Sequence, residues 1–277
     1  MQTFSMTGAT ALITGASAGL GVEFARQLAT RAKCLILAAR RVEALSAVRD
    51  QLVKEWPQLS VVICPADVST CSGRDAIASL IQEQQLPVNL LVNNAGLGDY
   101  GTFDSADPAR IQEQIDVNVT ALVQLTHKLL PDLKRNGPSA ILNVSSLAGT
   151  LPLPEMAIYA ATKAFVTSFT EALRIELAAH GVTACAVCPG PTPTNFSQTA
   201  RRVGGEDTNR EGQGFLRQPN DVVVREGLRS LEAGPATVYP GWGVTLAALL
   251  FRLLPRWLLR RQLTRRFQKS RTERSAK

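Results

Sequence analysis

A tyrosine and a lysine four residues apart, Tyr159 and Lys163, form a pair whose side chains could transfer a proton. Both fall in a stretch with helical spacing, Glu155–His180, and residues four apart on a helix project from the same face. A free phenol, with a pKa of about 10, is a poor proton shuttle at neutral pH, whereas a neighbouring ammonium stabilises the phenolate. The pair therefore predicts a proton-transfer site in which Lys163 lowers the pKa of Tyr159.

A glycine-rich turn near the N-terminus could hold phosphate. The sequence TGASAGLG, from Thr14 to Gly21, separates an apolar run from a segment with helical spacing. Glycines allow a tight turn there and let backbone N–H groups approach a pyrophosphate at the helix N-terminus. The turn predicts a dinucleotide site that includes Gly15, Ser17, Gly19, Leu20 and Gly21.

The end of the second predicted strand indicates which dinucleotide binds. An acidic side chain at this place would accept hydrogen bonds from the ribose 2′-hydroxyl and would repel a 2′-phosphate. The sequence has Arg40 and Arg41 instead, with no acid before Glu43. Guanidinium groups form charge-assisted and bidentate hydrogen bonds with phosphate. We therefore predict NADP(H) rather than NAD(H), since a pair of solvated arginines opening a helix would not explain the missing acid.

Short apolar runs alternate with longer segments of helical spacing along most of the chain. Unbroken apolar strands are buried on both faces, which is typical of a parallel sheet between two layers of helices. We predict one α/β domain, a doubly wound parallel sheet of the Rossmann type over residues 1–240, followed by a C-terminal apolar and basic helical extension over 241–277. The predicted strands are Ala9–Thr14, Cys34–Ala39, Val61–Pro65, Leu90–Asn94, Ala140–Ser145, Thr183–Pro189 and Ala236–Tyr239. The predicted helices are Leu20–Arg31, Val42–Trp56, Ser72–Gln85, Pro108–Lys134, Glu155–His180 and Pro219–Ala233.

In this order, the motifs resemble those of the short-chain dehydrogenases/reductases, over about Thr10 to Gly190 and more weakly to Tyr239. The resemblance implies a catalytic set of Asn118, Ser146, Tyr159 and Lys163, with Ser146 preferred to Ser145 because of the family's spacing. It also implies cofactor contacts at Asp67, Val68, Asn94, Ala95, Gly96, Tyr159, Lys163, Pro189 and Gly190.

The resemblance implies an oxidoreductase that interconverts a carbonyl compound and its alcohol. Tyr159 would transfer the proton, Lys163 would also bond the nicotinamide ribose, and Ser146 would stabilise charge on the substrate oxygen. Asn118, inside a long predicted helix, would have to disturb the local backbone in order to hold a water next to Lys163. The alternative from another class is a catalytically inactive dinucleotide-sensing or scaffolding protein of the same fold.

Segments that follow strand ends should supply the substrate pocket, and their residues are apolar. The expected pocket residues are Leu97, Leu147, Leu153, Met156, Pro191 and Phe196. No fixed charge is evident among them, which favours a lipophilic ketone, aldehyde or secondary alcohol. The polar, glycine-rich stretch Thr192–Arg217 is either a mobile lid with short helices or a tolerated surface insertion.

The net charge of +7 lies almost entirely in the C-terminal segment. Residues 252–277 contain ten basic residues and one acid, Glu273, so that this segment carries +9 and the rest of the chain −2. The body is therefore not expected to bind nucleic acid. Five cysteines without framework spacing indicate a reducing, cytoplasmic location, and we interpret Cys185 and Cys188 as buried apolar residues rather than as a metal site.

The C-terminal extension leaves two interpretations open. On a helix over Gly243–Arg260, the residues Leu246, Leu250, Leu253, Leu254 and Trp257 would share one face. Its apolar part is shorter than the roughly 20 residues that span a bilayer, and Pro255 would kink it. It lies either in an anionic membrane surface or against protein, its own body or a second subunit. The extension resembles that of a ketoacyl reductase-like and hydroxysteroid dehydrogenase-like subgroup, and the family resemblance implies a homo-oligomer.

Overall fold

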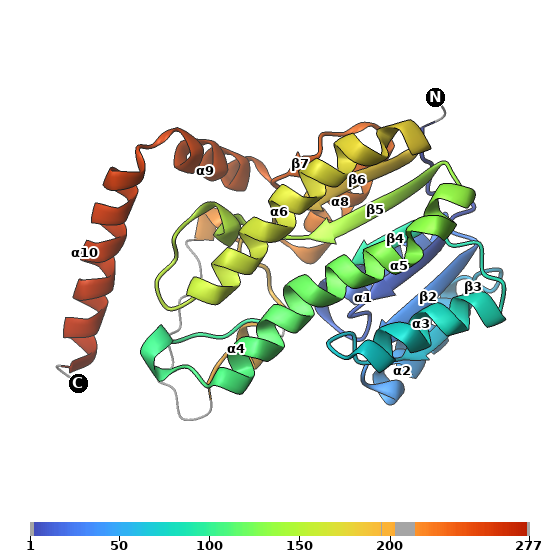
Figure 1. Cartoon of the computed structure of the whole chain (residues 1–277), viewed down its shortest axis with the longest axis horizontal. Helices are drawn as coiled ribbons and strands as arrows, with labels where there is room; N and C mark the ends of the chain where they lie inside the picture. Colours follow the sequence, from blue (N-terminus) through green and yellow to red (C-terminus); the bar gives the residue numbers. More distant parts are fainter. Residues whose placement is uncertain (1–2, 195, 203–213, 276–277) are drawn as a thin grey trace.

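A parallel sheet forms the centre of the protein. The computed structural model describes residues 3–194, 196–202 and 214–275, and in this part of the chain seven strands pair in the order β3-β2-β1-β4-β5-β6-β7 (Figure 1). Every neighbouring pair is parallel. The strands are β1 (Thr10–Thr14), β2 (Cys34–Ala39), β3 (Ser60–Pro65), β4 (Leu90–Asn93), β5 (Ser139–Val144), β6 (Val182–Val187) and β7 (Thr237–Val238). The predicted fold class is confirmed, and the predicted strands agree within two residues at each end.

Helices cover both faces of this sheet. The helices are α1 (Gly19–Ala29), α2 (Val42–Glu55), α3 (Cys71–Glu83), α4 (Pro108–Ile115), α5 (Ala121–Arg135), α6 (Ala157–Leu177), α7 (Phe196–Thr199), α8 (Asn220–Ala233), α9 (Trp242–Leu253) and α10 (Arg256–Ser275). One core cluster joins α1, α2 and α8 to the sheet, and the other joins α3, α5 and α6 to its opposite face. The layers explain the unbroken apolar strands, because neither face of β1, β2 or β4 meets solvent.

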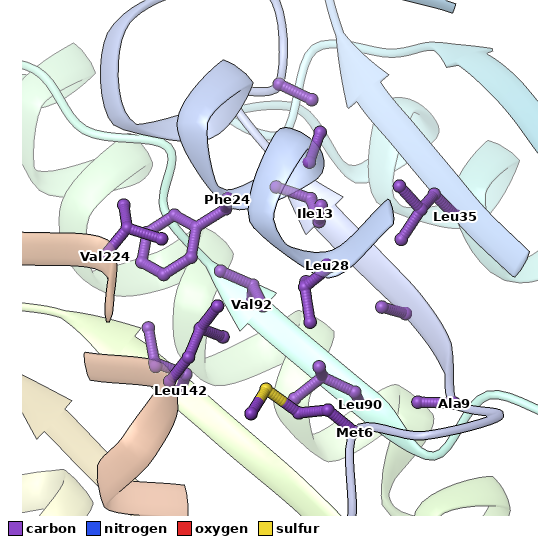
Figure 2. Packing of buried hydrophobic residues seen from close by; sticks show 14 of the residues in the cluster. Met6, Ala9, Ile13, Phe24, Leu28, Leu35, Leu90, Val92, Leu142 and Val224 are labelled. Carbon is purple, nitrogen blue, oxygen red and sulfur yellow. The ribbon is translucent and has the colours of Figure 1, made fainter. Parts of the chain in front are cut away.

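Large side chains from α1 fill the core on one face. Phe24 and Leu28 are fully buried and lie against Ile13, Val92 and Leu142 from three adjacent strands (Figure 2). Burial of a side chain of this size contributes about 2 kcal/mol. This packing fixes the start of α1, and with it the glycine turn, above the end of β1.

The strands are added to the sheet first on one side of β1 and then on the other. After β3 at one edge, the chain crosses through α3 and returns as β4 on the far side of β1. The connections that follow β1 and β4 therefore run to opposite faces, and a crevice opens between them at the carboxyl ends of the strands. This edge holds the residues of interest.

The long helix predicted over Pro108–Lys134 is interrupted. Asp107 caps its start through a hydrogen bond from the backbone N–H of Ala109 to Asp107 Oδ1 (3.0 Å), and Pro108 occupies the first turn. Residues Asp116–Thr120 form a π-helical turn, η2, between α4 and α5. A π-helical turn of this kind often marks a functional site, and here it contains Asn118.

The extension forms two helices rather than one. Leu254 has an extended backbone and Pro255 follows it, so that α9 ends at Leu253 and the chain turns by 116° into α10. The predicted stripe is therefore wrong beyond Leu253, because Trp257 lies on a different helix. No single described helix has the length and apolar character to cross a bilayer, although α9 and the first part of α10 would meet both criteria as one bent pair.

A chain of buried amides and hydroxyls joins the sheet to two helices. Asn93 Nδ2 on β4 donates to Thr126 Oγ1 on α5 (3.0 Å) and to Asn143 Oδ1 on β5 (2.9 Å). Asn143 Nδ2 in turn donates to Thr170 Oγ1 on α6 (2.8 Å). All four side chains are at most 4% exposed. Loss of any one of these hydrogen-bond partners would leave a buried polar group unsatisfied and lower the free energy of unfolding.

We predict that Asn143→Leu lowers the free energy of unfolding by about 2 kcal/mol, because the Asn93 amide loses a buried acceptor. The double variant Asn93→Leu/Asn143→Leu should lose less than the sum of the two single variants, since it removes both partners together. Urea denaturation measures the three values. Additive losses would contradict this coupling.

Candidate active site

The glycine turn has the backbone conformation that an anion cradle requires. Gly15 (φ 65°) and Gly19 (φ 57°) are left-handed, and a Cβ on Gly21 would collide with the carbonyl oxygen of Gly15. The first turn of α1 has no acidic residue and no side-chain cap. Its N–H groups and the positive end of the helix dipole therefore remain for a phosphate group.

The turn after β4 is tied to the glycine turn. Asn94 N donates to Thr14 Oγ1 (3.0 Å), and Asn94 Nδ2 donates to the carbonyl oxygens of Thr14 (2.8 Å) and Gly15 (3.3 Å). Ala95 N also donates to Thr14 Oγ1 (3.1 Å). These bonds hold the two sides of the crevice at a fixed distance.

The two arginines after β2 lie on the wall of this crevice. Arg41 Nη2 is 3.4 Å from the carbonyl oxygen of Ser17 in the glycine turn. Arg40 is 64% exposed, and its Nη1 lies 3.5 Å from Glu113 Oε1 and 3.9 Å from Asp67 Oδ2. Sequence reasoning missed Glu113, because nothing in the spacing of α4 indicates that it reaches the end of β2.

Asp67 is held in its ionised form. Partial burial works against the charge, but the Ser69 hydroxyl and N–H donate to Asp67 Oδ1 (2.7 and 3.0 Å), and Arg40 adds a positive charge. The two hydrogen bonds from Ser69 and the charge of Arg40 together hold the pKa of Asp67 below its usual range. Asp67 and Val68 line the same cavity as the arginines.

Tyr159 and Lys163 lie on one face of α6, and both are buried. The Lys163 Nζ lies 5.7 Å from the centre of the Tyr159 ring and donates to the carbonyl oxygen of Val144 on β5 (2.8 Å). Burial lowers the pKa of Lys163 to about 8. Burial also raises the pKa of Tyr159 to about 12, against the opposing effect of its hydrogen bond with Ser146.

The prediction that Lys163 lowers the pKa of Tyr159 is therefore wrong for this structure. Loss of solvent disfavours the charged form of both groups, and this cost exceeds any attraction between the ammonium and the phenolate. The phenol remains protonated at neutral pH. It is placed to give a proton rather than to take one.

The two adjacent serines have different surroundings. Ser145 Oγ donates to the carbonyl oxygen of Lys163 (2.7 Å), and it lies 2.7 Å from Thr167 Oγ1, so that it fixes α6 to the end of β5. Ser146 Oγ accepts from Ala148 N (3.1 Å) at the start of the short helix η3 (Leu147–Thr150), and it hydrogen-bonds with Tyr159. Both serines line the cavity, but the Ser145 hydroxyl is engaged with α6.

Asn118 is fully engaged behind the cavity wall. Its Oδ1 accepts from Leu97 N (2.8 Å), and its Nδ2 donates to the Leu97 carbonyl oxygen (2.9 Å) and to Thr162 Oγ1 (3.0 Å). A Cβ on Gly96 would lie 3.6 Å from Asn118 Oδ1 and 3.5 Å from Lys163 Nζ. Asn118 thus joins the turn after β4 to α6. The expected disturbance of the backbone is present as η2, whereas the water beside Lys163 stays a prediction.

One cavity of about 1960 Å³ collects the predicted residues. Every predicted cofactor and pocket residue lines it except Gly21, which packs beneath the glycine turn. Among the predicted catalytic residues, Ser146, Tyr159 and Lys163 line it and Asn118 does not. The predicted pocket residues Leu97, Leu147, Leu153, Met156, Pro191 and Phe196 are all in the wall. The Phe196 ring lies 5.3 Å from that of Tyr159.

Several residues of the cavity wall were not predicted from the sequence. They are Tyr100 and Leu151 from loops, Phe215 and Leu216 from η5 (Gly214–Leu216), and Leu246, Leu250, Leu259 and Leu263 from α9 and α10. The expectation of a pocket without fixed charge needs correction, because Arg201, Arg202, Arg217 and Arg266 also line the cavity. No sequence pattern places a C-terminal helix over a strand end.

The described part of Thr192–Arg217 contributes to the cavity wall. Arg202 forms a bidentate ion pair with Asp99 (Nη2 to Oδ2, 2.6 Å; Nε to Oδ1, 3.0 Å) and also donates to the Thr102 carbonyl oxygen (3.1 Å). This pair ties the segment after α7 to the loop after β4. The short helices expected here are present as α7 and η5, and residues 203–213 lie outside the described residues.

A metal centre has no support in the described residues. They contain no cluster of three or more His, Cys, Asp or Glu side chains that could hold a metal ion. Cys185 and Cys188 are buried free thiols in and after β6, and burial raises the pKa of each to about 11.

Comparison with known proteins agrees with this arrangement. A ketoacyl reductase, HetN of Nostoc sp., is 37% identical over 186 residues, which cover 67% of this chain and 64% of that protein. A sulfoacetaldehyde reductase of Chromohalobacter salexigens is 38% identical over 196 residues, 70% of this chain and 76% of that protein. A short-chain dehydrogenase from Sphingobium yanoikuyae, solved in complex with NADPH, superposes with a TM-score of 0.75 at 30% identity over 87% of this chain and 92% of its own.

A family model described as short chain dehydrogenase matches residues 9–203, more than half of the chain. The match includes the glycine turn, the turn after β4, Ser146 and the Tyr159–Lys163 pair. The chain therefore belongs to the short-chain dehydrogenases, oxidoreductases that act on CH–OH and C=O groups.

Proposed function

We propose that the protein is an NADP(H)-dependent carbonyl reductase that converts a lipophilic ketone or aldehyde to the corresponding alcohol. The observation that carries the proposal is a single cavity in which a buried, protonated Tyr159 faces apolar walls and the glycine turn lies further along. An inactive sensor or scaffold of this fold would not need a buried lysine behind that tyrosine.

The side chains of the cavity divide the reaction among them. A nicotinamide dinucleotide, when bound, supplies the hydride that reaches the carbonyl carbon. Tyr159 Oη gives its proton to the carbonyl oxygen, and Ser146 Oγ donates a hydrogen bond to the same oxygen as negative charge develops on it. The Lys163 ammonium, held by the Val144 carbonyl oxygen, stabilises the tyrosinate that remains.

The preference for NADP(H) rests on the charges at the end of β2. Arg40 and Arg41 stand at the cavity wall, and Arg40 is shared between the two carboxylates of Asp67 and Glu113. A 2′-phosphate would offer Arg40 a stronger partner than these partly exposed acids. The Sphingobium structure, an NADPH complex, supports this preference by similarity.

The proposal extends to the assembly and its location. Ile175 on α6 is 79% exposed and Phe165 is 41% exposed, which supports a homo-oligomer in which α6 contacts a second copy. The five free cysteines support a reducing, cytoplasmic location. The exposed apolar residues of α9 support peripheral association of the protein with a membrane. With such an association, we propose a role in lipid metabolism.

Tyr159→Phe should abolish carbonyl reduction while NADPH binding is kept. Removal of a general acid lowers kcat by about 10²–10⁴-fold. NADPH oxidation with a panel of ketones and aldehydes measures the first effect, and fluorescence titration of NADPH measures the second. Tyr239→Phe, which changes a tyrosine outside the cavity, is the matched control. Turnover by the Tyr159→Phe variant at the wild-type rate would defeat the mechanism.

Arg40→Asp should weaken NADPH binding far more than NADH binding, by about tenfold or more in the ratio of the two Kd values. The new carboxylate repels a 2′-phosphate and accepts from a 2′-hydroxyl. Arg49→Asp makes the same charge change on the exposed face of α2 and should leave the ratio unchanged. Equal losses for both dinucleotides would mean that the phosphate is not bound at this place.

Lys163 should make the protein more stable as the pH rises from about 8 toward its ordinary pKa of 10.5. In this window the unfolded chain still binds the proton that the folded chain has released, so the contribution of Lys163 to the free energy of unfolding increases with pH, whereas the buried thiols of Cys185 and Cys188 contribute in the opposite direction. Lys163→Met should remove this increase, as measured by urea denaturation between pH 7 and 10. Lys54→Met on exposed α2 is the control. An identical pH profile in the Lys163→Met variant would show that burial does not penalise the charge.

A further inference from the structure

Helix α9 is apolar on both of its faces, but only one face is covered. Val244, Ala247 and Ala248 are buried in a cluster with Leu147 of η3. The outward face carries larger side chains, which are 47–78% exposed: Trp242 78%, Leu246 47%, Leu249 53% and Leu253 72%. These four lie within one helical face at 100° per residue. We name this set the α9 ridge.

Positive charge follows the α9 ridge along the chain. Ten basic residues and one acid, Glu273, follow from Arg252 onward. On α10 the residues Arg256, Arg260, Arg261, Arg265 and Lys269 are exposed, whereas Leu259 is buried and Leu263 lines the cavity. Trp257, at its start, is 65% exposed. The apolar α9 ridge, which begins at Trp242, is thus joined to a helix rich in arginine.

We propose that α9 and α10 dock on the surface of a lipid bilayer that contains anionic lipids. Leucines of the α9 ridge would enter the boundary between headgroups and acyl chains, the tryptophans would lie at headgroup level, and the arginines would bind lipid phosphates. The turn of 116° between the helices fits a shallow, monotopic contact. A second copy is a poorer occupant, because a two-fold contact through the α9 ridge would bring two segments of charge +9 together.

The catalytic cavity reaches this surface. Leu246 and Leu250 of α9 are both about half exposed and both line the cavity that contains Tyr159. Leu259 and Leu263 of α10 line the same cavity. A compound with a long apolar chain can therefore pass from the bilayer between α9 and α10 toward Tyr159. This step rests on the proposed reductase function, and it names the substrate class as a membrane-resident carbonyl lipid.

Vesicle flotation with the full chain tests the docking directly. We expect the protein to float with vesicles of phosphatidylcholine and phosphatidylglycerol, to float far less with phosphatidylcholine alone, and to be released by high salt. Absence of flotation with the anionic vesicles, or equal flotation with both kinds, would overturn the proposal.

Two sets of variants separate the contribution of the α9 ridge to vesicle binding from that of the arginines of α10. Leu249→Glu/Leu253→Glu should reduce vesicle binding roughly tenfold or more, because both leucines are exposed and neither lines the cavity. Val42→Glu/Val53→Glu makes the same change at two exposed positions on α2 and should not affect vesicle binding. Arg261→Gln/Arg265→Gln should weaken binding roughly fivefold for each arginine. A fall in oligomer mass in the ridge variant without loss of flotation would identify the ridge as a subunit contact and overturn the proposal.

Activity on two substrates separates this inference from the proposed function. The Leu249→Glu/Leu253→Glu variant should reduce a water-soluble ketone within about twofold of the wild type, and 2-heptadecanone held in anionic vesicles roughly tenfold more slowly. Flotation without activity on any carbonyl compound would refute the reductase function and leave the docking intact. Equal activity of the variant and the wild type on the vesicle ketone would refute the route from the bilayer.

Discussion

The hydrogen bonds of Asn94 across the centre of the sheet hold the site together. The chain leaves β1 and β4 in opposite directions, and nothing in the covalent structure keeps the two turns at a fixed distance. Asn94 does so through its N–H and its side-chain amide, which bind the hydroxyl of Thr14 and the carbonyl oxygens of Thr14 and Gly15. The glycine cradle and the turn that carries Gly96 and Leu97 are thereby fixed as the two walls of one crevice. The amide chain through Asn93 and Asn143 joins the same strands to α5 and α6, two helices of one layer.

Burial controls the chemistry of the residues that line this crevice. Lys163 and Tyr159 are both removed from water, and each shifts toward its neutral form. The bonds that compensate are local: the Val144 carbonyl oxygen accepts from Lys163, and Ser146 bonds with Tyr159. A neutral phenol with a hydrogen-bonded serine beside it favours proton donation to an oxygen that is becoming negative. The same burial makes the site sensitive to substitution, because an uncompensated polar group there is costly.

The C-terminal extension adds wall residues to the cavity and leaves the arrangement of Ser146, Tyr159 and Lys163 to the rest of the fold. Helix α9 closes one side with small residues against η3, and α10 adds apolar and cationic side chains to the far wall. The proposed lipid substrate would lie along these apolar side chains. The −2 charge of the body and the +9 charge of the segment from Arg252 onward give the molecule one strongly cationic end. Apolar exposure and positive charge thus occur in the same helices.

The sequence by itself determined the fold class, because apolar runs of strand length can be buried only between two helical layers, and it determined the cradle, because Gly15 and Gly19 permit a left-handed backbone. It also indicated Tyr159, Lys163 and Ser146 through local spacing and family resemblance. Only the tertiary structure decided the protonation of Tyr159, since burial depends on β5, η3 and Phe196 as well as on the neighbouring lysine. It alone placed Glu113 beside Arg40 and the leucines of α10 on the cavity wall. These contacts join residues far apart in the chain, and no local pattern encodes where two distant elements meet.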